Sequence, residues 1–295
     1  MAEPIIDMVN LQRFLDYILE RYKIHLRKDA HQYPITTNVI FQRHKFINIC
    51  RKHDTQTKNV IKYVVNNEDL TLEDKILNII MFRGWGIYDT FRLFGGAWTK
   101  EELMSPETIP DAQKKYEKIL RASPKRRFFT SAAYVVNLKT ATVDKFKCCS
   151  VISIFHLAQM AVERNIPKKI LEAKSEQEVI DLLRTLTGVA DTLAYQIFLD
   201  LTYIPEFQFT DDNYVVASTR VRFSLRALFK YSDGLSYEEC IMWLRDNLSN
   251  LAPEFVDELK RTMIDTPPEN RVMTLTMLQS SLYGFSDYFK ITTRR

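Results

Sequence analysis

Glycine is scarce in this chain, and its scarcity excludes two nucleotide-binding folds. The 295 residues include 7 glycines, which are Gly84, Gly86, Gly95, Gly96, Gly188, Gly234 and Gly284. Neither the GxGxxG pattern of dinucleotide-binding proteins nor the GxxxxGK[ST] pattern of P-loop proteins can be written with these positions, so both phosphate cradles are absent. Few glycines and long segments of helical apolar periodicity together predict a mostly helical protein.

Cysteine is also sparse and shows no metal-binding spacing. The four cysteines are Cys50, Cys148, Cys149 and Cys240, and no CxxC pair occurs. Free thiols in a reducing compartment are therefore the plain interpretation. Cys50 and His53 lie close enough to share a metal ion, but no further ligands accompany them, so we expect no metal and no cofactor.

Long apolar runs are also missing, and we expect no leader peptide at the start of this sequence. The first residues, "MAEPIIDMVN", lack the basic start and apolar core of a signal peptide. No apolar run approaches the roughly 20 residues that span a bilayer. We therefore expect a soluble intracellular protein without a membrane partner. The net charge of +4 and pI near 8.7 permit nucleic-acid binding without requiring it.

Apolar residues recur at helical spacing through most of the chain, which predicts an all-α fold. The stretch "EFQFTDDNYVVAS" instead looks extended, and "FGGAWTKEELMSPETIP" looks like a turn-rich connector. The expected helices are residues 5–27, 44–65, a segment that begins near Thr71, 111–122, 145–165 and two helices around Gly188.

The stretch "HKFINICRKHDTQTK", residues 44–58, has an unusual polar surface. Its apolar residues recur at helical spacing, while its other faces carry Asn48, Arg51, Asp54, Gln56 and Lys58. Arg51 and Asp54 lie three residues apart and can meet on one helix face. Spacing alone favours a surface ion pair that contributes less than about 1 kcal/mol.

Residues of about 178–201 fit a helix–hairpin–helix pattern around Gly188. Such a hairpin exposes backbone N–H groups that bind a DNA phosphate without reading sequence. The usual second glycine is Ala190 here. A simple helical corner remains the alternative. Helix–hairpin–helix DNA glycosylases place a catalytic aspartate soon afterwards, and Asp211 and Asp212 lie at about that distance; the alternative is that they cap a helix beginning near Val216 or Arg220.

Several segments, taken in order, resemble the phage thymine-hypermodification proteins. That group includes the helical domain of 5-hydroxymethyluracil DNA kinases and the amino acid:DNA transferases, also called glutamyl/putrescinyl thymine pyrophosphorylases. The similar segments are "YPITTNVIFQRHKFINICRKHDTQTKNVI", "IIMFRGW", "FFTSAAYVVN", "DTLAYQIFLDLTYIPEFQFTDDNYVVAS" and "TMLQSSLYGFSDYFKI". The chain departs from the family pattern at Ser218–Arg220, where a Gly-Pro-Gly is usual, and at Tyr283–Gly284, where Cys-Glu is usual.

The resemblance implies an all-α, DNA-glycosylase-like fold with a helix–hairpin–helix. It implies one helical domain over residues 1–295. This domain could consist of two lobes with the active cleft between them. The kinase reaction needs a P-loop, which is absent, so the transferase reaction remains: an amino acid or polyamine displaces pyrophosphate from 5-pyrophosphoryloxymethyluracil. The implied partners are double-stranded DNA carrying modified thymine and a free amino acid or polyamine. The implied location is the cytoplasm of the infected bacterial host.

The resemblance also suggests catalytic roles. A carboxylate that accepts the proton of the amine is assigned first to Asp54 and second to Asp212. Cations that stabilise the departing pyrophosphate are assigned to Arg51 and Arg83. For Arg83 the alternative is a structural salt bridge to Asp54 or Asp89.

Further residues are assigned to binding. Amide groups that can read a uracil edge are expected from Asn48 and Gln56. The remaining substrate-binding candidates are Asn213 and two possible stacking platforms, Tyr134 and Tyr214. The DNA-binding candidates are Lys125, Arg126 and Arg127 in "SPKRRFF", Gly188, Ala190 and Arg220, with Arg222 and Arg226 along the same track. Trp85 and Trp98 are expected in the core.

Two other functions stay open at this point. One is a DNA glycosylase that removes a modified base and uses Asp212 to stabilise the sugar cation. The other is a non-catalytic DNA-binding partner of a modification complex.

Overall fold

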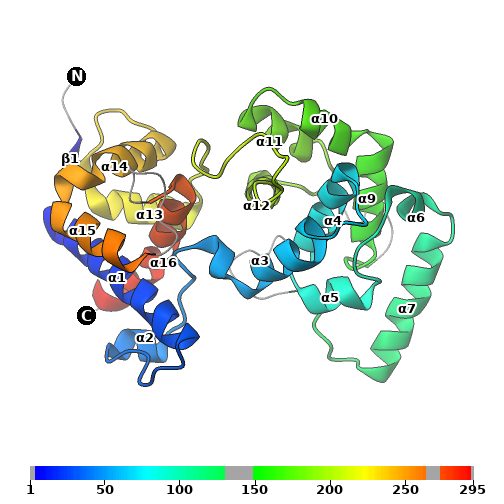
Figure 1. Cartoon of the computed structure of the whole chain (residues 1–295), viewed down its shortest axis with the longest axis horizontal. Helices are drawn as coiled ribbons and strands as arrows, with labels where there is room; N and C mark the ends of the chain where they lie inside the picture. Colours follow the sequence, from blue (N-terminus) through cyan, green and yellow to red (C-terminus); the bar gives the residue numbers. More distant parts are fainter. Residues whose placement is uncertain (1–3, 130–148, 264–272, 294–295) are drawn as a thin grey trace. The chain divides into compact units, whose positions relative to one another are not determined.

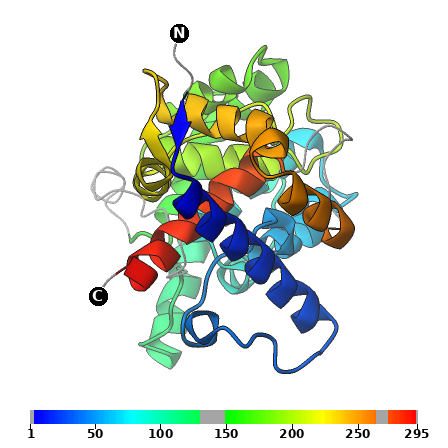
Figure 2. The same cartoon turned by 90° about the vertical axis from the view of Figure 1, so that its left-hand side faces the viewer.

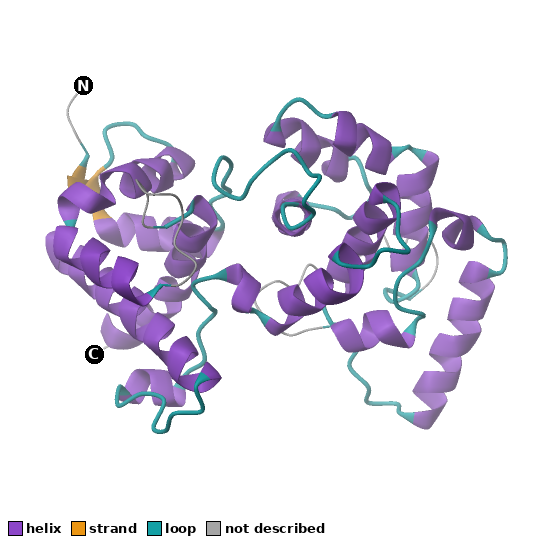
Figure 3. Cartoon of the chain, viewed as in Figure 1, coloured by secondary structure: helices purple, strands orange, loops and turns teal. Residues whose placement is uncertain are grey.

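The computed structural model describes residues 4–129, 149–263 and 273–293. These residues are predominantly helical, which confirms the all-α prediction (Figure 3). The strands in the described part are β1 (Ile5–Ile6) and β2 (Phe229–Tyr231), which pair antiparallel. Among these residues no helix is both long enough and apolar enough to cross a bilayer.

The chain forms two compact units. Unit 1 comprises Met1–Asp54 and Asp211–Arg295, and unit 2 comprises Thr55–Thr210. The chain leaves unit 1 directly after Asp54 and returns at Asp211. The candidate site residues are therefore divided between two separately packed bodies.

Unit 1 is built around the C-terminal helix. Its helices are α1 (Met8–Asp29), α2 (Val39–Arg43), the short 3₁₀ helix η1 (Arg51–His53), α13 (Thr219–Leu228), α14 (Tyr237–Leu251), α15 (Pro253–Thr262) and α16 (Leu275–Thr293). Helix α13 packs along α16, and the hydroxyl of Ser224 donates to the carbonyl of Leu282 at 2.6 Å. Helix α1 also contacts α16, as Figure 2 shows with α1 in blue and α16 in red.

Gly284 allows α1 and α16 to approach closely. Tyr17 is fully buried and lies among the rings of Phe41, Phe46 and Tyr288. A Cβ atom at position 284 would overlap the Tyr17 hydroxyl and would lie 3.2 Å from its Cζ atom. The ring cannot move aside without disturbing this aromatic cluster.

Gly284→Ala is therefore expected to destabilise the protein by about 1–3 kcal/mol, as overpacked core substitutions do. This loss opposes the gain of about 1 kcal/mol that alanine brings to a helix interior. The measurement is a urea unfolding curve. The double variant Gly284→Ala with Tyr17→Phe lacks the clashing hydroxyl and should recover most of the loss relative to Tyr17→Phe alone. A double variant as unstable as the additive sum would contradict this explanation.

Unit 2 is built around α4. Its helices are α3 (Thr55–Val60), the π-helical turn η2 (Ile61–Val65), α4 (Leu72–Trp85), α5 (Tyr88–Leu93), α6 (Lys100–Met104), α7 (Thr108–Ala122), α9 (Ser153–Glu163), α10 (Ile166–Glu172), α11 (Glu176–Arg184) and α12 (Asp191–Leu201). Helix α4 contacts α9, α10 and α12 (Figure 1), and residues 76–85 are all buried. The predicted start near Thr71 is confirmed, because Thr71 and Asp74 form a capping box.

The predicted helix over residues 44–65 is wrong in its first half. Residues 44–50 are not helical, and regular helix begins only at Thr55. The reason is tertiary: the Arg21 guanidinium binds the carbonyls of Phe46 and Ile47, which a helix would need for its own hydrogen bonds.

Other expectations for single segments meet mixed outcomes. "EFQFTDDNYVVAS" contains no strand, and α6 interrupts the supposed connector between Phe94 and α7. Trp85 is core as expected, because it is 1% exposed and its Nε1 donates to the carbonyl of Val151. Trp98 is half-buried. The part of the apolar stretch at residues 145–148 lies outside the described residues, and α9 covers Ser153–Glu163.

Candidate functional site

Asn48 and Asp54 are brought together, and a residue from α1 joins them. The Asn48 amide Nδ2 donates to Oδ1 of Asp54 at 3.2 Å. The amide oxygen of Asn48 accepts a hydrogen bond from Nη2 of Arg21. The Nε of Arg21 also donates to the carbonyls of Phe46 (3.2 Å) and Ile47 (2.8 Å). A guanidinium, an amide and a carboxylate thus form a continuous chain within unit 1.

Arg51 begins the short helix η1 that carries the chain to Asp54. Its side chain is 4% exposed, and its carbonyl accepts from the Asp54 backbone N–H at 2.9 Å. The ring of His53 stacks on that of His25 in α1, with centroids 3.8 Å apart. Helix η1 also contacts α16. Two long helices therefore hold the segment that ends in Asp54.

Gln56 belongs to unit 2 and has a local structural contact. Its Oε1 accepts a hydrogen bond from the backbone N–H of Tyr88 at 2.8 Å. This bond satisfies a donor at the N-terminus of α5, where Ile87 supplies no side-chain cap. The amide oxygen of Gln56 is thus used within the fold.

Arg83 lies in the interior of unit 2 and is paired with Asp200 of α12. Its Nη2 donates to Oδ1 of Asp200 at 2.8 Å, and its Nε donates to Oδ2. Nη2 also reaches the hydroxyl of Thr57 at 3.3 Å. The arginine is 3% exposed and the aspartate 0%. The expectation that the alternative partner would be Asp54 or Asp89 is wrong, because Asp200 occupies that place.

Asp212 fixes the loop before α13 to the first turn of α16. Its Oδ1 accepts from the backbone N–H of Leu275 at 2.9 Å, and Nη1 of Arg245 lies 3.3 Å from the same oxygen. The expectation that these aspartates cap a helix near Val216 or Arg220 is wrong, since Ser218 is the N-cap of α13. Asp212 instead binds the start of a helix 63 residues away in the sequence.

Asp211 precedes it and is also half-buried. The hydroxyl of Thr274 is 3.5 Å from its Oδ2, and the hydroxyl of Thr276 donates to its carbonyl at 2.9 Å. Burial, and then the neighbouring charge of Asp212, raise the pKa of Asp211, while the charge of Lys52 lowers it. Lys52 belongs to η1, so the segment that ends at Asp54 contributes a charge that acts on Asp211.

Asp211→Asn should stabilise the protein at pH 7 and leave its stability near pH 3 almost unchanged relative to wild type. Well below 3.8, the ordinary pKa of aspartate, the group is protonated whether the chain is folded or not. As the pH rises, the unfolded chain releases this proton first, so folding loses stability until the folded-state pKa is passed. Asparagine has no such titration.

Urea unfolding of both proteins across this pH range measures the difference. Asp257→Asn, which removes an exposed carboxylate of α15, serves as the control for the change in net charge. A constant difference between Asp211→Asn and wild type at every pH would contradict the assignment.

The other candidates in unit 1 lie nearer the surface. Asn213 is exposed and Tyr214 is half-buried. Arg220 pairs with Asp287 of α16 at 2.7 Å, and its guanidinium lies 4.8 Å from the ring centre of Tyr283. Its charge is therefore partly balanced. Tyr134 lies outside the described residues.

The basic run after α7 is exposed, but one of its aromatic neighbours is not. Lys125, Arg126 and Arg127 all face solvent. Phe128 is 6% exposed, with its ring against Phe94 and Tyr116 and its carbonyl bonded to the hydroxyl of Thr90. Phe128 therefore anchors the run to unit 2 and cannot stack on a base.

The predicted pair of helices around Gly188 is present as α11 and α12. Gly188 has φ 89°, a left-handed conformation that favours glycine, and Ala190 is the N-cap residue of α12. Asp191 in the first turn of α12 forms an ion pair with Nε of Arg184 at 2.9 Å. A carboxylate thus already lies beside the positive end of this helix dipole.

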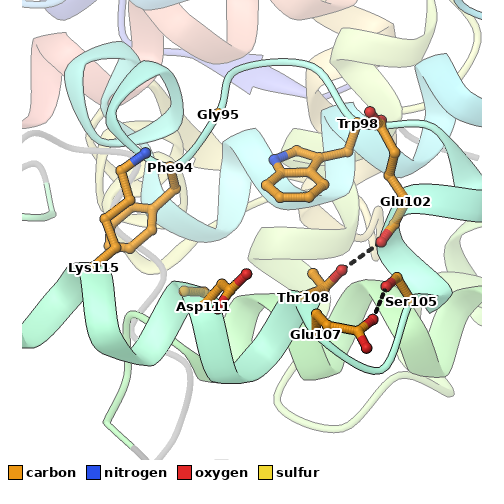
Figure 4. A pocket seen from close by; sticks show the side chains of 10 residues that line it. Phe94, Gly95, Trp98, Glu102, Ser105, Glu107, Thr108, Asp111 and Lys115 are labelled. Carbon is orange, nitrogen blue, oxygen red and sulfur yellow. Dashed lines mark hydrogen bonds between the residues drawn. The ribbon is translucent and has the colours of Figure 1, made fainter.

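Unit 2 also contains a surface cavity of about 350 Å³ (Figure 4). The Trp98 ring forms one wall, Asp111 and Lys115 project from α7, and Glu107 is the N-cap residue of that helix. Its carboxylates would favour a cation over a phosphate, but the Glu107 carboxylate already accepts from the hydroxyl of Ser105 at 2.6 Å. None of the predicted site residues in the described part lines this cavity.

Three charged residues that sequence reasoning missed organise these sites: Arg21, Asp200 and Arg245. Arg21 occupies the apolar stripe of α1, three residues after the fully buried Ile18. Asp200 lies in a run of buried residues in α12. A charge at a core position of an amphipathic helix is the signal that points to a buried partner. Across the described ranges, no group of three or more His, Cys, Asp or Glu side chains could hold a metal ion.

These features define a helical protein of two units, with buried charged networks in both. The family model described as 5-hmdU DNA kinase, helical domain, matches residues 9–294, and the chain belongs to this family. The resemblance drawn from the sequence motifs is thus confirmed. Neither the curated proteins nor the solved structures that were compared include a match to the chain.

Proposed function

We propose that the protein modifies thymine in DNA by transferring an amine onto 5-pyrophosphoryloxymethyluracil. The main support for this proposal is the family match over residues 9–294, in a chain whose glycines cannot form a P-loop. The family description names a kinase of 5-hmdU DNA. Without a phosphate cradle, a chain related to its helical part is better suited to use a phosphorylated base than to make one.

The reaction is a displacement at an exocyclic methylene carbon. The lone pair of a neutral amine forms a C–N bond, and the C–O bond to pyrophosphate breaks. The pyrophosphate leaves with the bonding electrons, and the new ammonium group loses a proton to a base. The target base lies inside the duplex, so we propose that it flips out, at a cost of a few kcal/mol.

Asp54 is the carboxylate that accepts this proton. It is half-buried, it terminates a segment held by α1 and α16, and Asn48 binds one of its oxygens. Arg51 is the candidate cation for the departing pyrophosphate. Arg83 has a structural role in this proposal, because Asp200 already balances its charge. Asn48 then supports Asp54 through its amide NH₂ group, while its amide oxygen accepts from Arg21. Tyr214 remains a candidate stacking surface.

We assign contacts with the DNA backbone to residues of both units. The exposed cations Lys125, Arg126 and Arg127 suit phosphates, and so does Arg220. The hairpin between α11 and α12 supplies a further phosphate contact if the fold is glycosylase-like with a helix–hairpin–helix, as we propose. The reaction would take place in the cytoplasm of a phage-infected bacterium.

One observation favours a second candidate function, a DNA glycosylase. Asp211 follows the hairpin at the expected distance, and the charge of Lys52 in η1 acts to lower its pKa. A carboxylate in that position can stabilise a sugar cation when a base departs. The two functions differ in their product, because a glycosylase releases a free base and leaves the DNA with an abasic site.

Nucleoside mass spectrometry separates the candidates. The protein is incubated with DNA containing 5-pyrophosphoryloxymethyluracil and a mixture of amino acids and polyamines, and the DNA is then digested. A nucleoside heavier by one amine, with pyrophosphate released, supports the transferase. A released base supports the glycosylase. DNA that binds but returns unchanged would refute both and leave a non-catalytic binding role.

A further inference from the structure

Arg21 is a buried charge in α1 that lies outside the sequence motifs. It is 8% exposed, and burial lowers the pKa of its guanidinium. Burying a guanidinium costs solvation free energy unless hydrogen bonds or an opposite charge compensate for the lost water. Its position on the apolar stripe, after Phe14 and Ile18, means that an aliphatic residue would suit helix packing better.

The hydrogen bonds of Arg21 determine how Asn48 is oriented. A guanidinium has only donors, so the Asn48 side chain must turn its oxygen toward Arg21 and its NH₂ group toward Asp54. The same guanidinium holds the carbonyls of Phe46 and Ile47 and keeps this segment out of a helix.

One donor of Arg21 is left without a bond. Its Nη1 is buried and has no hydrogen-bond partner among the described residues. An arginine that served only to join α1 to its neighbours would be expected to satisfy every buried donor. Instead, Nε and Nη2 both donate hydrogen bonds to one segment, residues 46–48, and Nη1 donates none within the described part of the chain.

We propose that Arg21 is a positioning residue, which acts through Asn48 to fix the Asp54 carboxylate for proton transfer from the incoming amine. This inference rests on the proposed transferase function. Hydrogen bonds that fix a base before reaction avoid the loss of rate that follows from small errors in placement. Arg21 itself need not touch the substrate.

The first test is Arg21→Lys. Lysine keeps the charge but cannot bond two carbonyls and an amide with a planar fork. The expected result is a kcat for amine transfer lower by about 100-fold, with KM for DNA unchanged, as for a small misplacement of a catalytic group. Asn48→Ser, which breaks the same chain at its centre, should give a similar loss and covers the case in which Arg21→Lys does not fold.

Arg27→Lys is the matched control. Arg27 also lies on α1 and donates to a loop carbonyl, that of Ile35 at 3.0 Å, but it has no contact with Asn48 or Asp54. It should keep the wild-type kcat. An equal loss of kcat in Arg21→Lys and Arg27→Lys would overturn the proposal, because it would show that loosening any contact of α1 is sufficient to slow the reaction.

A double variant tests whether Arg21 acts through Asp54. Once Asp54→Asn has removed the base, adding Arg21→Lys should lower the residual kcat no further. A full additional loss in the Asp54→Asn background would overturn the proposal and indicate an independent role.

A readout without catalysis separates this inference from the proposed function. The side-chain NH₂ signals of Asn48 in the ¹⁵N spectrum should show slow hydrogen exchange in wild type and Arg27→Lys, and fast exchange in Arg21→Lys. If wild-type protein makes no transfer product, the transferase function fails, and so does the role of Asp54 in proton transfer. The orienting effect of Arg21 is still decided by the exchange rates, and unchanged exchange in Arg21→Lys would refute it.

Discussion

Asp54→Asn is expected to lower the rate of amine transfer by about 10²–10⁴-fold, the usual contribution of a general base. Asparagine has nearly the same shape, and its side-chain oxygen can still accept the hydrogen bond that Asn48 donates at 3.2 Å. The substitution therefore removes the proton acceptor while retaining the local contact. DNA affinity should be unchanged, because the lost group acts on the amine.

Single-turnover mass spectrometry measures the rate, and fluorescence anisotropy with labelled DNA measures the affinity. Asp257→Asn, at an exposed carboxylate of α15, is the matched control and should behave as wild type. Transfer at the wild-type rate in Asp54→Asn would remove Asp54 from the mechanism. If Asp211→Asn abolished base release while Asp54→Asn had no effect, the glycosylase would become the better account.

Arg83→Ala is expected to destabilise the protein by about 3–5 kcal/mol, because it removes the guanidinium that balances the charge of the buried Asp200 carboxylate. Asp200 is 0% exposed, so water cannot replace the lost guanidinium unless unit 2 opens. Arg83 also links α4 to α3 through the hydroxyl of Thr57. Unit 2 should therefore unfold at a much lower denaturant concentration.

Arg83→Met combined with Asp200→Leu tests the cause of this effect. Replacing both charges by apolar groups removes the buried carboxylate together with the guanidinium, so the double variant should be far more stable than Arg83→Ala. The exposed pair Arg184 and Asp191 provides the control, since Arg184→Ala should change the unfolding free energy by less than about 1 kcal/mol. Wild-type stability of Arg83→Ala would contradict the buried ion pair.

Local signals made some elements predictable. Helix α4 begins after Thr71 because a capping box and a continuous apolar run lie within a few residues of each other. The turn between α11 and α12 follows from Gly188, whose φ of 89° other residues rarely adopt. In each case the residues that stabilise the element are neighbours in the sequence.

The segment before Asp54 shows where such signals fail. Residues 44–50 have the periodicity of a helix. However, the carbonyls of Phe46 and Ile47 accept hydrogen bonds from Arg21, which is about 25 residues away in the chain. Asn48 lies close to Asp54 because a non-helical segment leads into the 3₁₀ helix η1. Both residues were predicted to belong to the site, but neither their hydrogen bond nor the local structure that produces it was predicted.

The sequence by itself determined the helical character, the lack of a P-loop and the family. These depend on composition, motif order and short-range spacing. Only the tertiary structure decided the partners of the buried charges: Arg83 with Asp200, 117 residues away, and Arg21 with Asn48. A desolvated charge must be paired wherever the fold brings a counter-group, and that choice depends on long-range packing, which no local pattern encodes.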